Sequence, residues 1–196
     1  MKKIMFNDCY GLTQAVIDGR KTMTRRIEFD KEFQKMIDDS DSYYYDDGYL
    51  VFATQDVDIH HVKTKYKVGE IVAVAQKYYN VFSPEYDLPV DGLDKTPGWR
   101  NKMFVRADLM THQILITGIK CERLQDISNT DCLKEGIRQA YAESILGMYG
   151  YIDHKGTGLW FNTPREAFAS LIDKVSGRGT WASNPYVVAY EFELVK

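Results

Sequence analysis

The fold and the function are inferred first from one segment, Gly19-Arg20-Lys21-Thr22-Met23-Thr24-Arg25-Arg26, here called the basic segment. It follows a predicted helix whose apolar face is formed by Leu12, Ala15 and Val16, and Gly19 is placed to end that helix. Four of its residues are basic, so it carries +4 in a chain whose net charge is −3, and the remaining residues carry −7. Positive charge is therefore concentrated here against an acidic background.

Two residues of the basic segment have the chemistry of a nucleophilic pair. A lysine in a partly enclosed pocket loses its proton near neutrality, because burial and nearby positive charge both disfavour the ammonium form. Lys21 is flanked by arginines, and as an amine it can deprotonate the hydroxyl of Thr24, three residues further on. The alternative is a basic loop that contacts phosphates or solvent, and composition alone favours this alternative.

Glu135 is the second candidate for chemistry. Ser128 and Asp131 form a capping-box pattern that opens a short predicted helix, and Gly136 ends it. Glu135 lies at the carboxyl end of this helix, where the helix dipole disfavours an anion. Its carboxyl group is then held by a cation or kept protonated, as a general acid must be. An exposed glutamate without a role is the default alternative.

The rest of the chain predicts several strands and few helices. A helix is expected to begin at Thr163-Pro164-Arg165-Glu166, which combines an N-cap, a proline at the first position and a glutamate at the third. Residues 28–50 predict a short helix and then a polar loop, and the prolines within residues 83–98 predict a long exposed connection. Strands are expected at residues 51–54, 71–75, 114–124 and 186–194. Without regular strand–helix alternation, this order favours a single α+β domain over residues 1–196, a compact β-barrel with helical decorations.

Composition excludes several classes of protein. With 44% hydrophobic and 27% charged residues the chain is globular, and no apolar run approaches the ~20 residues of a membrane span. The three cysteines are far apart, which predicts reduced thiols in the cytoplasm rather than disulfides or a zinc knuckle. His60 and His61 are adjacent and would face opposite sides of a strand, so neither a metal site nor another cofactor is expected.

Together with three further groups of residues, the basic segment resembles the ASCH family, in particular its phage- and prophage-type members. The first group is Lys67-Val68-Gly69-Glu70 leading into Ile71-Val72-Ala73-Val74. The second is Leu124-Gln125-Asp126-Ile127-Ser128 followed by Glu135-Gly136-Ile137, and the third is Gly179-Thr180-Trp181 with Asn184-Pro185-Tyr186-Val187 and the terminal strand. The resemblance implies a PUA-like β-barrel with short flanking helices, related to RNA-binding modules, and a cleft between the barrel and the helices.

The resemblance also implies a reaction. Small bacterial members are amidohydrolases that remove the acetyl group from the exocyclic nitrogen of acetylated cytidine, without a metal. By motif, Lys21 is then the base, Thr24 the nucleophile and Glu135 the proton donor. Other members are proposed RNA binders or ribonucleases, so the fold does not decide the reaction. This chain departs from many relatives in having Ala75-Gln76 where they have Arg-Glu, and in two long insertions, at about residues 28–66 and 79–112.

Several residues are candidates for binding a nucleoside or RNA. Trp99 and Trp181 can each stack on a base, although tryptophan in a small barrel is more often a packing residue. The full set of candidates is Arg20, Arg25, Arg26, Gln76, Trp99, Trp181 and Asn184. Two alternatives to the enzyme stay open: a non-catalytic RNA-binding module, and a phage accessory protein that contacts a host protein. The sequence predicts no membrane partner and does not give the oligomeric state.

Overall fold

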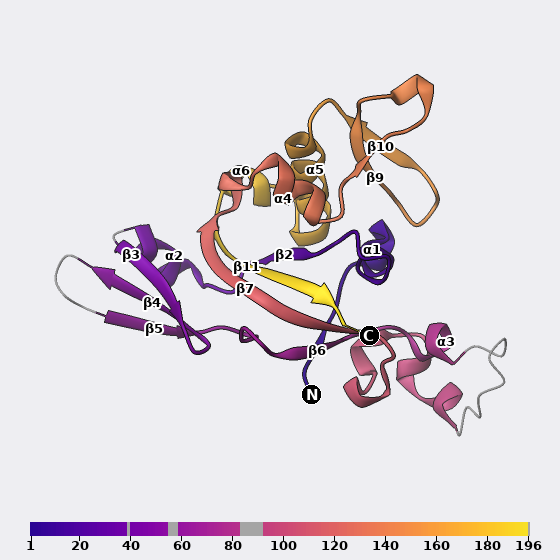
Figure 1. Cartoon of the computed structure of the whole chain (residues 1–196), viewed down its shortest axis with the longest axis horizontal. Coiled ribbons are helices and arrows are strands. Elements are labelled where there is room, and N and C mark those ends of the chain that lie inside the picture. The colour runs from indigo at the N-terminus through magenta and orange to yellow at the C-terminus, as the bar shows by residue number, and fades with distance from the viewer. Residues whose placement is uncertain (39, 55–58, 83–91, 196) are drawn as a thin grey trace.

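The computed structural model describes residues 1–38, 40–54, 59–82 and 92–195. It confirms the α+β class: short helices surround three separate sheets (Figure 1). Within the described residues none of these sheets closes into a barrel, so the barrel itself stays a prediction. None of the helices found there has the length and hydropathy of a membrane-spanning helix.

The central sheet has the strand order β1-β6-β7-β11-β2. Its strands are β1 (Lys3–Ile4), β6 (Ile71–Val74), β7 (Gln113–Arg123), β11 (Tyr186–Leu194) and β2 (Met23–Arg26). The long strands β7 and β11 pair in antiparallel register and curve together through the middle of the molecule (Figure 1). The three strands predicted at residues 71–75, 114–124 and 186–194 are confirmed to within a residue at each end. Strand β2 was not predicted, and among the described strands it pairs with β11 alone.

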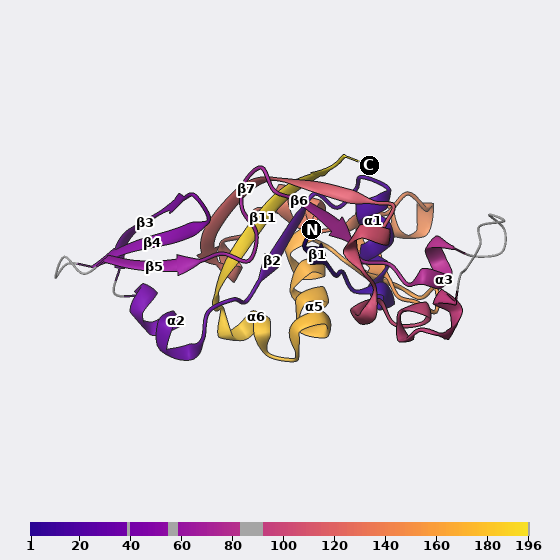
Figure 2. The same cartoon turned by 90° about the horizontal axis from the view of Figure 1, so that it is seen from below.

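A second sheet, β3-β4-β5, extends from one end of the molecule (Figures 1 and 2). It follows α2 (Lys31–Asp38) and comprises β3 (Ser40–Asp46), β4 (Tyr49–Thr54) and β5 (Ile59–Lys63). The expectation of a polar loop at residues 40–46 is wrong, because tyrosines of β3 have apolar partners. The ring of Tyr43 lies 5.8 Å from that of Phe52, and its hydroxyl donates to the carbonyl of Cys121. The predicted insertion at residues 28–66 thus forms a sheet that packs on the central one.

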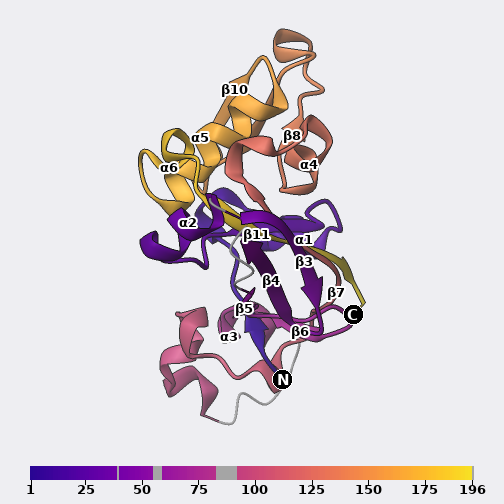
Figure 3. The same ribbon diagram turned by 90° about the vertical axis from the view of Figure 1, so that its left-hand side faces the viewer.

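The third sheet and the helices that follow β7 lie on one side of the central sheet, at the top of Figure 3. This part contains α4 (Asn129–Lys134), β8 (Arg138–Gln139), β9 (Tyr149–Ile152), β10 (Gly158–Phe161), α5 (Pro164–Ser176) and α6 (Thr180–Ser183). Both predicted helix starts are confirmed. The Oγ1 of Thr163 accepts from the backbone N–H of Glu166 at 3.1 Å, and the Glu166 carboxylate accepts from the Thr163 N–H at 3.2 Å. The Oγ of Ser128 accepts from the N–H of Asp131 at 3.0 Å.

The remaining elements form a smaller unit at the opposite end of the molecule from β3-β4-β5 (Figure 2). It contains α3 (Tyr78–Val81) and a series of 3₁₀ turns between residues 93 and 109, within the predicted insertion at residues 79–112. Its own core is built around Ala73, Ala75, Tyr78 and Met110. Part of the predicted exposed connection, residues 83–91, lies outside the described residues. Helix α1 (Leu12–Ile17) packs on the larger core, where the sequence predicted a helix.

Candidate active site

The candidate site is a cavity of about 360 Å³, here called the Lys21 cavity, between β2, the start of the chain and α5. It falls in the size range of small-molecule sites, which begins at about 300 Å³. One wall is polar and carries Lys21, Thr24, Arg25, Arg26 and Glu135. The opposite wall is apolar. Its side chains include Phe6, Leu12, Phe168, Leu171 and Ile172.

Backbone contacts bring the two distant segments of the polar wall together. The N–H of Thr22 donates to the carbonyl of Lys134 at 2.9 Å, which ties the start of β2 to the end of α4. Gly136 then turns the chain with a φ of +103°, a conformation that favours glycine. A Cβ at this position would lie 3.3 Å from Leu12 and 3.7 Å from the Cβ of Lys21. The close approach at Gly136 therefore fixes where Glu135 meets Lys21.

Lys21 is 2% exposed and is surrounded by acceptors. Its Nζ donates to the Oε2 of Glu135 at 2.6 Å, to the backbone carbonyl of Glu135 at 2.9 Å and to that of Met23 at 2.7 Å. Burial lowers the pKa of Lys21, the charge of Glu135 opposes this, and the charges of Arg26 and Arg25 lower it further. The lysine and the glutamate thus form a buried acid–base pair. In this pair Lys21 loses its proton more readily than an exposed lysine does.

Thr24 lies on β2 opposite Tyr190 of β11 and is 6% exposed. Its side chain lines the same cavity as Lys21 and Glu135. The Thr24 hydroxyl makes no side-chain hydrogen bond to any residue that the structure describes. It therefore faces the cavity with both its proton and its lone pairs available, as a nucleophile requires.

Arg25 is buried, and its donors are taken up by carboxylates. Its Nε donates to Glu122 at 2.7 Å and its Nη1 to the Oε1 of Glu135 at 3.1 Å. Its Nη2 lies 3.1 Å from Asp131, which Lys120 also contacts at 3.3 Å. Each oxygen of the Glu135 carboxylate thus has its own cation, Lys21 on one and Arg25 on the other. This geometry lets Arg25 position the Glu135 carboxylate, and its predicted contact with a substrate stays a prediction.

Arg26 and Arg20 differ in their relation to the cavity. Arg26 lines it, and its Nη2 donates to the carbonyl of Met5 at 2.8 Å. The Nε of Arg26 is buried and has no acceptor among the described residues. A buried donor without a partner costs about 1–3 kcal/mol. Arg20 does not line the cavity, and it pairs with Asp18 at 2.8 Å.

Two predicted binding residues lie in the smaller unit, away from the cavity. Gln76 is bonded through Oε1 to the Nδ1 of His112 at 2.8 Å. Trp99 packs edge-on against Tyr79, with 5.8 Å between the ring centroids. Neither lines the Lys21 cavity. Ala75 packs in the smaller core and Gln76 bonds to His112 beside it, so both positions lie away from the cavity.

The other two predicted binding residues have structural contacts near α6. Trp181 packs edge-on against Phe168 at 6.1 Å, and the guanidinium of Arg165 lies 5.1 Å from its ring centroid. The Oδ1 of Asn184 accepts from the N–H of Gln125 at 2.7 Å, and its own φ of +44° ends α6. These contacts place Trp181 as a packing residue and Asn184 as a turn residue, and neither lines the cavity.

Sequence reasoning missed the acidic partners of Arg25 and the apolar wall. Glu122 alternates with Lys120 along one face of β7, and this period-2 charge pair was a usable signal. For α5 the sequence predicted where the helix begins, but not that its residues Leu171 and Ile172 form part of the apolar wall of the cavity. Within the described part of the chain, no three His, Cys, Asp or Glu side chains are grouped so that they could hold a metal ion.

Compared with protein-family models, with curated proteins and with solved structures, the chain has no match. Its function is therefore inferred from the residues that line the Lys21 cavity and from their contacts.

Proposed function

We propose that the chain is a metal-independent amidohydrolase of the ASCH type, which removes the acyl group from the exocyclic nitrogen of an acylated cytidine. We propose further that its central sheet is an open form of a PUA-like barrel. The observation that carries the proposal is the 2.6 Å contact between Lys21 and Glu135, in a cavity that Thr24 also lines. Two residues separated by 114 positions provide a base and an acid at one centre.

The pair exchanges protons with the substrate in a balanced cycle. The amine of Lys21 accepts the proton of the Thr24 hydroxyl while the Thr24 oxygen attacks the amide carbonyl. The carboxyl group of Glu135 gives its proton to the departing exocyclic nitrogen, the C–N bond breaks, and an acyl-threonine forms. Glu135, now a carboxylate, takes a proton from water, which attacks the ester. The ammonium of Lys21 returns a proton to the Thr24 oxygen, so the products are cytidine and a carboxylic acid.

Two arginines support this cycle in different ways. The guanidinium of Arg26, a residue that lines the cavity, supplies positive charge beside the oxyanion that develops on the carbonyl oxygen. Arg25 holds the Glu135 carboxylate in place from the side opposite Lys21. Because these groups are fixed by the surrounding structure, they need no rearrangement when charge develops.

The pairing of the basic segment counts against a site built mainly to hold RNA phosphates. Lys21 is paired with Glu135, Arg20 with Asp18, and Arg25 with three carboxylates. Arg26 alone of the four has no carboxylate partner among the described residues. The +4 of the basic segment is therefore largely neutralised, which reduces the attraction for a phosphate backbone.

Release of cytidine from acetylated cytidine by the purified protein tests the proposal. Thr24→Val removes the nucleophile at nearly constant volume and is expected to lower kcat at least 10³-fold. Thr24→Ser keeps the hydroxyl and should retain measurable turnover. Thr22→Val is the matched control, since Thr22 lies two residues away and does not line the cavity. Wild-type protein without turnover, but with tight and salt-sensitive RNA binding, would support the RNA-binding module instead.

A further inference from the structure

A second pocket, here called the Arg138 pocket, is lined by Arg20 and by residues of α4, β8, β9 and β10. Its volume is about 540 Å³, larger than that of the Lys21 cavity. Arg20, the residue before Lys21, lines it, and so do residues 137–142, which begin two positions after Glu135. None of the residues that line the Lys21 cavity lines this pocket as well. The proposed hydrolysis does not use it.

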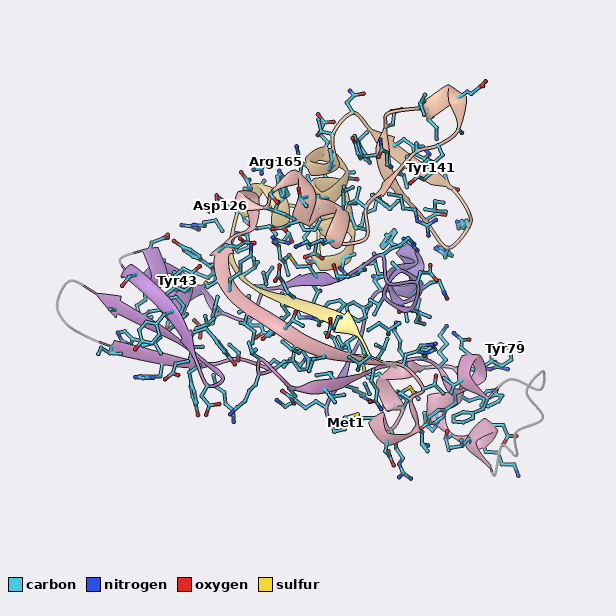
Figure 4. All side chains as sticks on the ribbon, in the orientation of Figure 1. Met1, Tyr43, Tyr79, Asp126, Tyr141 and Arg165 are labelled. Carbon is cyan, nitrogen blue, oxygen red and sulfur yellow. The ribbon has the colours of Figure 1, made fainter. Side chains whose placement is uncertain are left out.

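Most of the pocket wall is apolar. Leu133 at the end of α4, Ile145, and Ile152 of β9 contribute aliphatic side chains, and Trp160 of β10 contributes an aromatic ring. Tyr141 is 89% exposed at the rim, and Figure 4 shows it in the part of the molecule formed by β9 and β10. Such a wall fits a flat, apolar molecule better than it fits an ion alone.

The charge in this pocket is unbalanced. Arg138 of β8 is half-buried, and its guanidinium has no ion pair or hydrogen bond with any described residue. Arg20 lines the same pocket, and its one carboxylate partner is Asp18. Burial lowers the pKa of Arg138, the charge of Arg20 lowers it further, and Asp18 opposes both. Five guanidinium N–H donors are thus held beside an apolar wall without an anion to meet them.

We propose that the Arg138 pocket binds a small organic anion with a flat, apolar body, whose carboxylate or phosphate is held by Arg138 and Arg20. The two arginines provide the charge complement for the anionic group, and the planar fork of Arg138 matches the two oxygens of a carboxylate or phosphate. The wall formed by Ile145, Ile152 and Trp160 covers the apolar body. This site is separate from the Lys21 cavity, so its occupation does not depend on the proposed reaction.

Three probes that share one ring system test the proposal by isothermal titration calorimetry. They are 2-naphthoate, 2-naphthyl phosphate and the neutral 2-naphthamide. At least one of the two anions is expected to bind at least tenfold more tightly than the amide, and the better of the two identifies the head group. Acetate and inorganic phosphate alone are expected to bind at least tenfold more weakly than the naphthyl anions. Equal binding of all three naphthyl probes, or no binding of any, would overturn the proposal.

Variants assign the binding to this pocket. Arg138→Met keeps an unbranched, flexible side chain but removes the guanidinium and its charge, and it should weaken binding of the preferred anion at least tenfold. Arg138→Lys keeps the positive charge but lacks the planar guanidinium fork, so its affinity for the anion should lie between those of Arg138→Met and the wild type. Arg178→Met is the matched control, because Arg178 is exposed and does not line the pocket. Unchanged binding by Arg138→Met, with thermal unfolding like that of the wild type, would place the ligand elsewhere and overturn the proposal.

Discussion

The Lys21 cavity and the Arg138 pocket both include residues from the basic segment and from residues 133–142, but they differ in whether their cations are paired with carboxylates. In the cavity, Lys21 and Arg25 are buried against the carboxylate of Glu135. In the pocket, Arg138 is half-buried with no anionic partner among the described residues. Burying a charge is costly unless it is paired. The paired side chains of the cavity are therefore held in place by one another, whereas the unpaired cation of the pocket is available to a ligand. The predictions below test this contrast.

The largest effect is expected from breaking the paired network. Glu135→Leu leaves Lys21 and Arg25 buried without the acceptor they share, and it should lower the free energy of unfolding by about 3–5 kcal/mol in urea denaturation. The double variant Lys21→Met/Glu135→Leu removes one orphaned cation and should recover part of that loss. If the free energy of unfolding of Glu135→Leu lay within about 1 kcal/mol of the wild-type value, Lys21 and Glu135 would not be a tightly coupled pair.

Removal of the charge of Arg26 should alter catalysis in two ways. Arg26→Met removes the guanidinium and its positive charge, and it should lower kcat/KM for acetylated cytidine about 10²–10³-fold. Because the charge of Arg26 lowers the pKa of Lys21, its removal raises that pKa. Lys21 must be neutral to act as a base, so the rise of kcat/KM with pH should move to higher pH. Arg26→Lys keeps the charge and is the control; a profile that moves equally in both variants would exclude this electrostatic cause.

A smaller effect is expected at the rim of the network. Burial opposes the ionisation of Asp131, but the charges of Lys120 and Arg25 outweigh it and lower the pKa of Asp131 below its usual 3.8. Its stabilising contribution is therefore complete above about pH 4 and is lost as pH falls through the folded-state pKa. Asp131→Asn should cost about 1 kcal/mol at pH 7 and progressively less below pH 4 in urea denaturation. Asp126→Asn, at an exposed position, is the control. Its free energy of unfolding should differ from that of the wild type by the same small amount at pH 7 and below pH 4.

The smallest effect on stability is expected in the Arg138 pocket. Because Arg138 has no hydrogen-bond or ion-pair partner in the part of the chain that the structure describes, Arg138→Met should leave the free energy of unfolding within about 0.5 kcal/mol of the wild type. The same urea series that includes Glu135→Leu measures this difference directly. A loss above about 1.5 kcal/mol would mean that Arg138 stabilises the fold, and the contrast between the two sites would fail.

Local signals predicted much of the fold. The capping box of Thr163 and Glu166 can be recognised from the sequence, because both residues lie within one helical turn. The strands at residues 114–124 and 186–194 have enough apolar residues to be recognised without their neighbours. The strand at residues 40–46 was missed because its polar composition reads as loop, and only tertiary contacts such as that of Tyr43 with Phe52 stabilise it.

The candidate site was predictable in part. Lys21, Thr24 and Glu135 were proposed together through the family resemblance, and they line one cavity. The contacts of Arg25 with Glu122 and Asp131 depend on how β2, β7 and α4 pack, which no local pattern specifies. Gln76 and Trp99 lie away from the Lys21 cavity, and nothing near them in sequence shows that they belong with a separate small core.

The pairing of β2 has a consequence for the synthesis of the protein. Strand β2 carries Thr24 and Arg25, and its only strand partner in the described structure is β11, residues 186–194. At about 5–20 residues per second, the ribosome needs several seconds after making residue 24 to make those that β2 pairs with. The nascent chain therefore cannot assemble the cavity until β11 has emerged. Premature termination before residue 186 would release a polypeptide in which β2, with Thr24 and Arg25, lacks this strand partner.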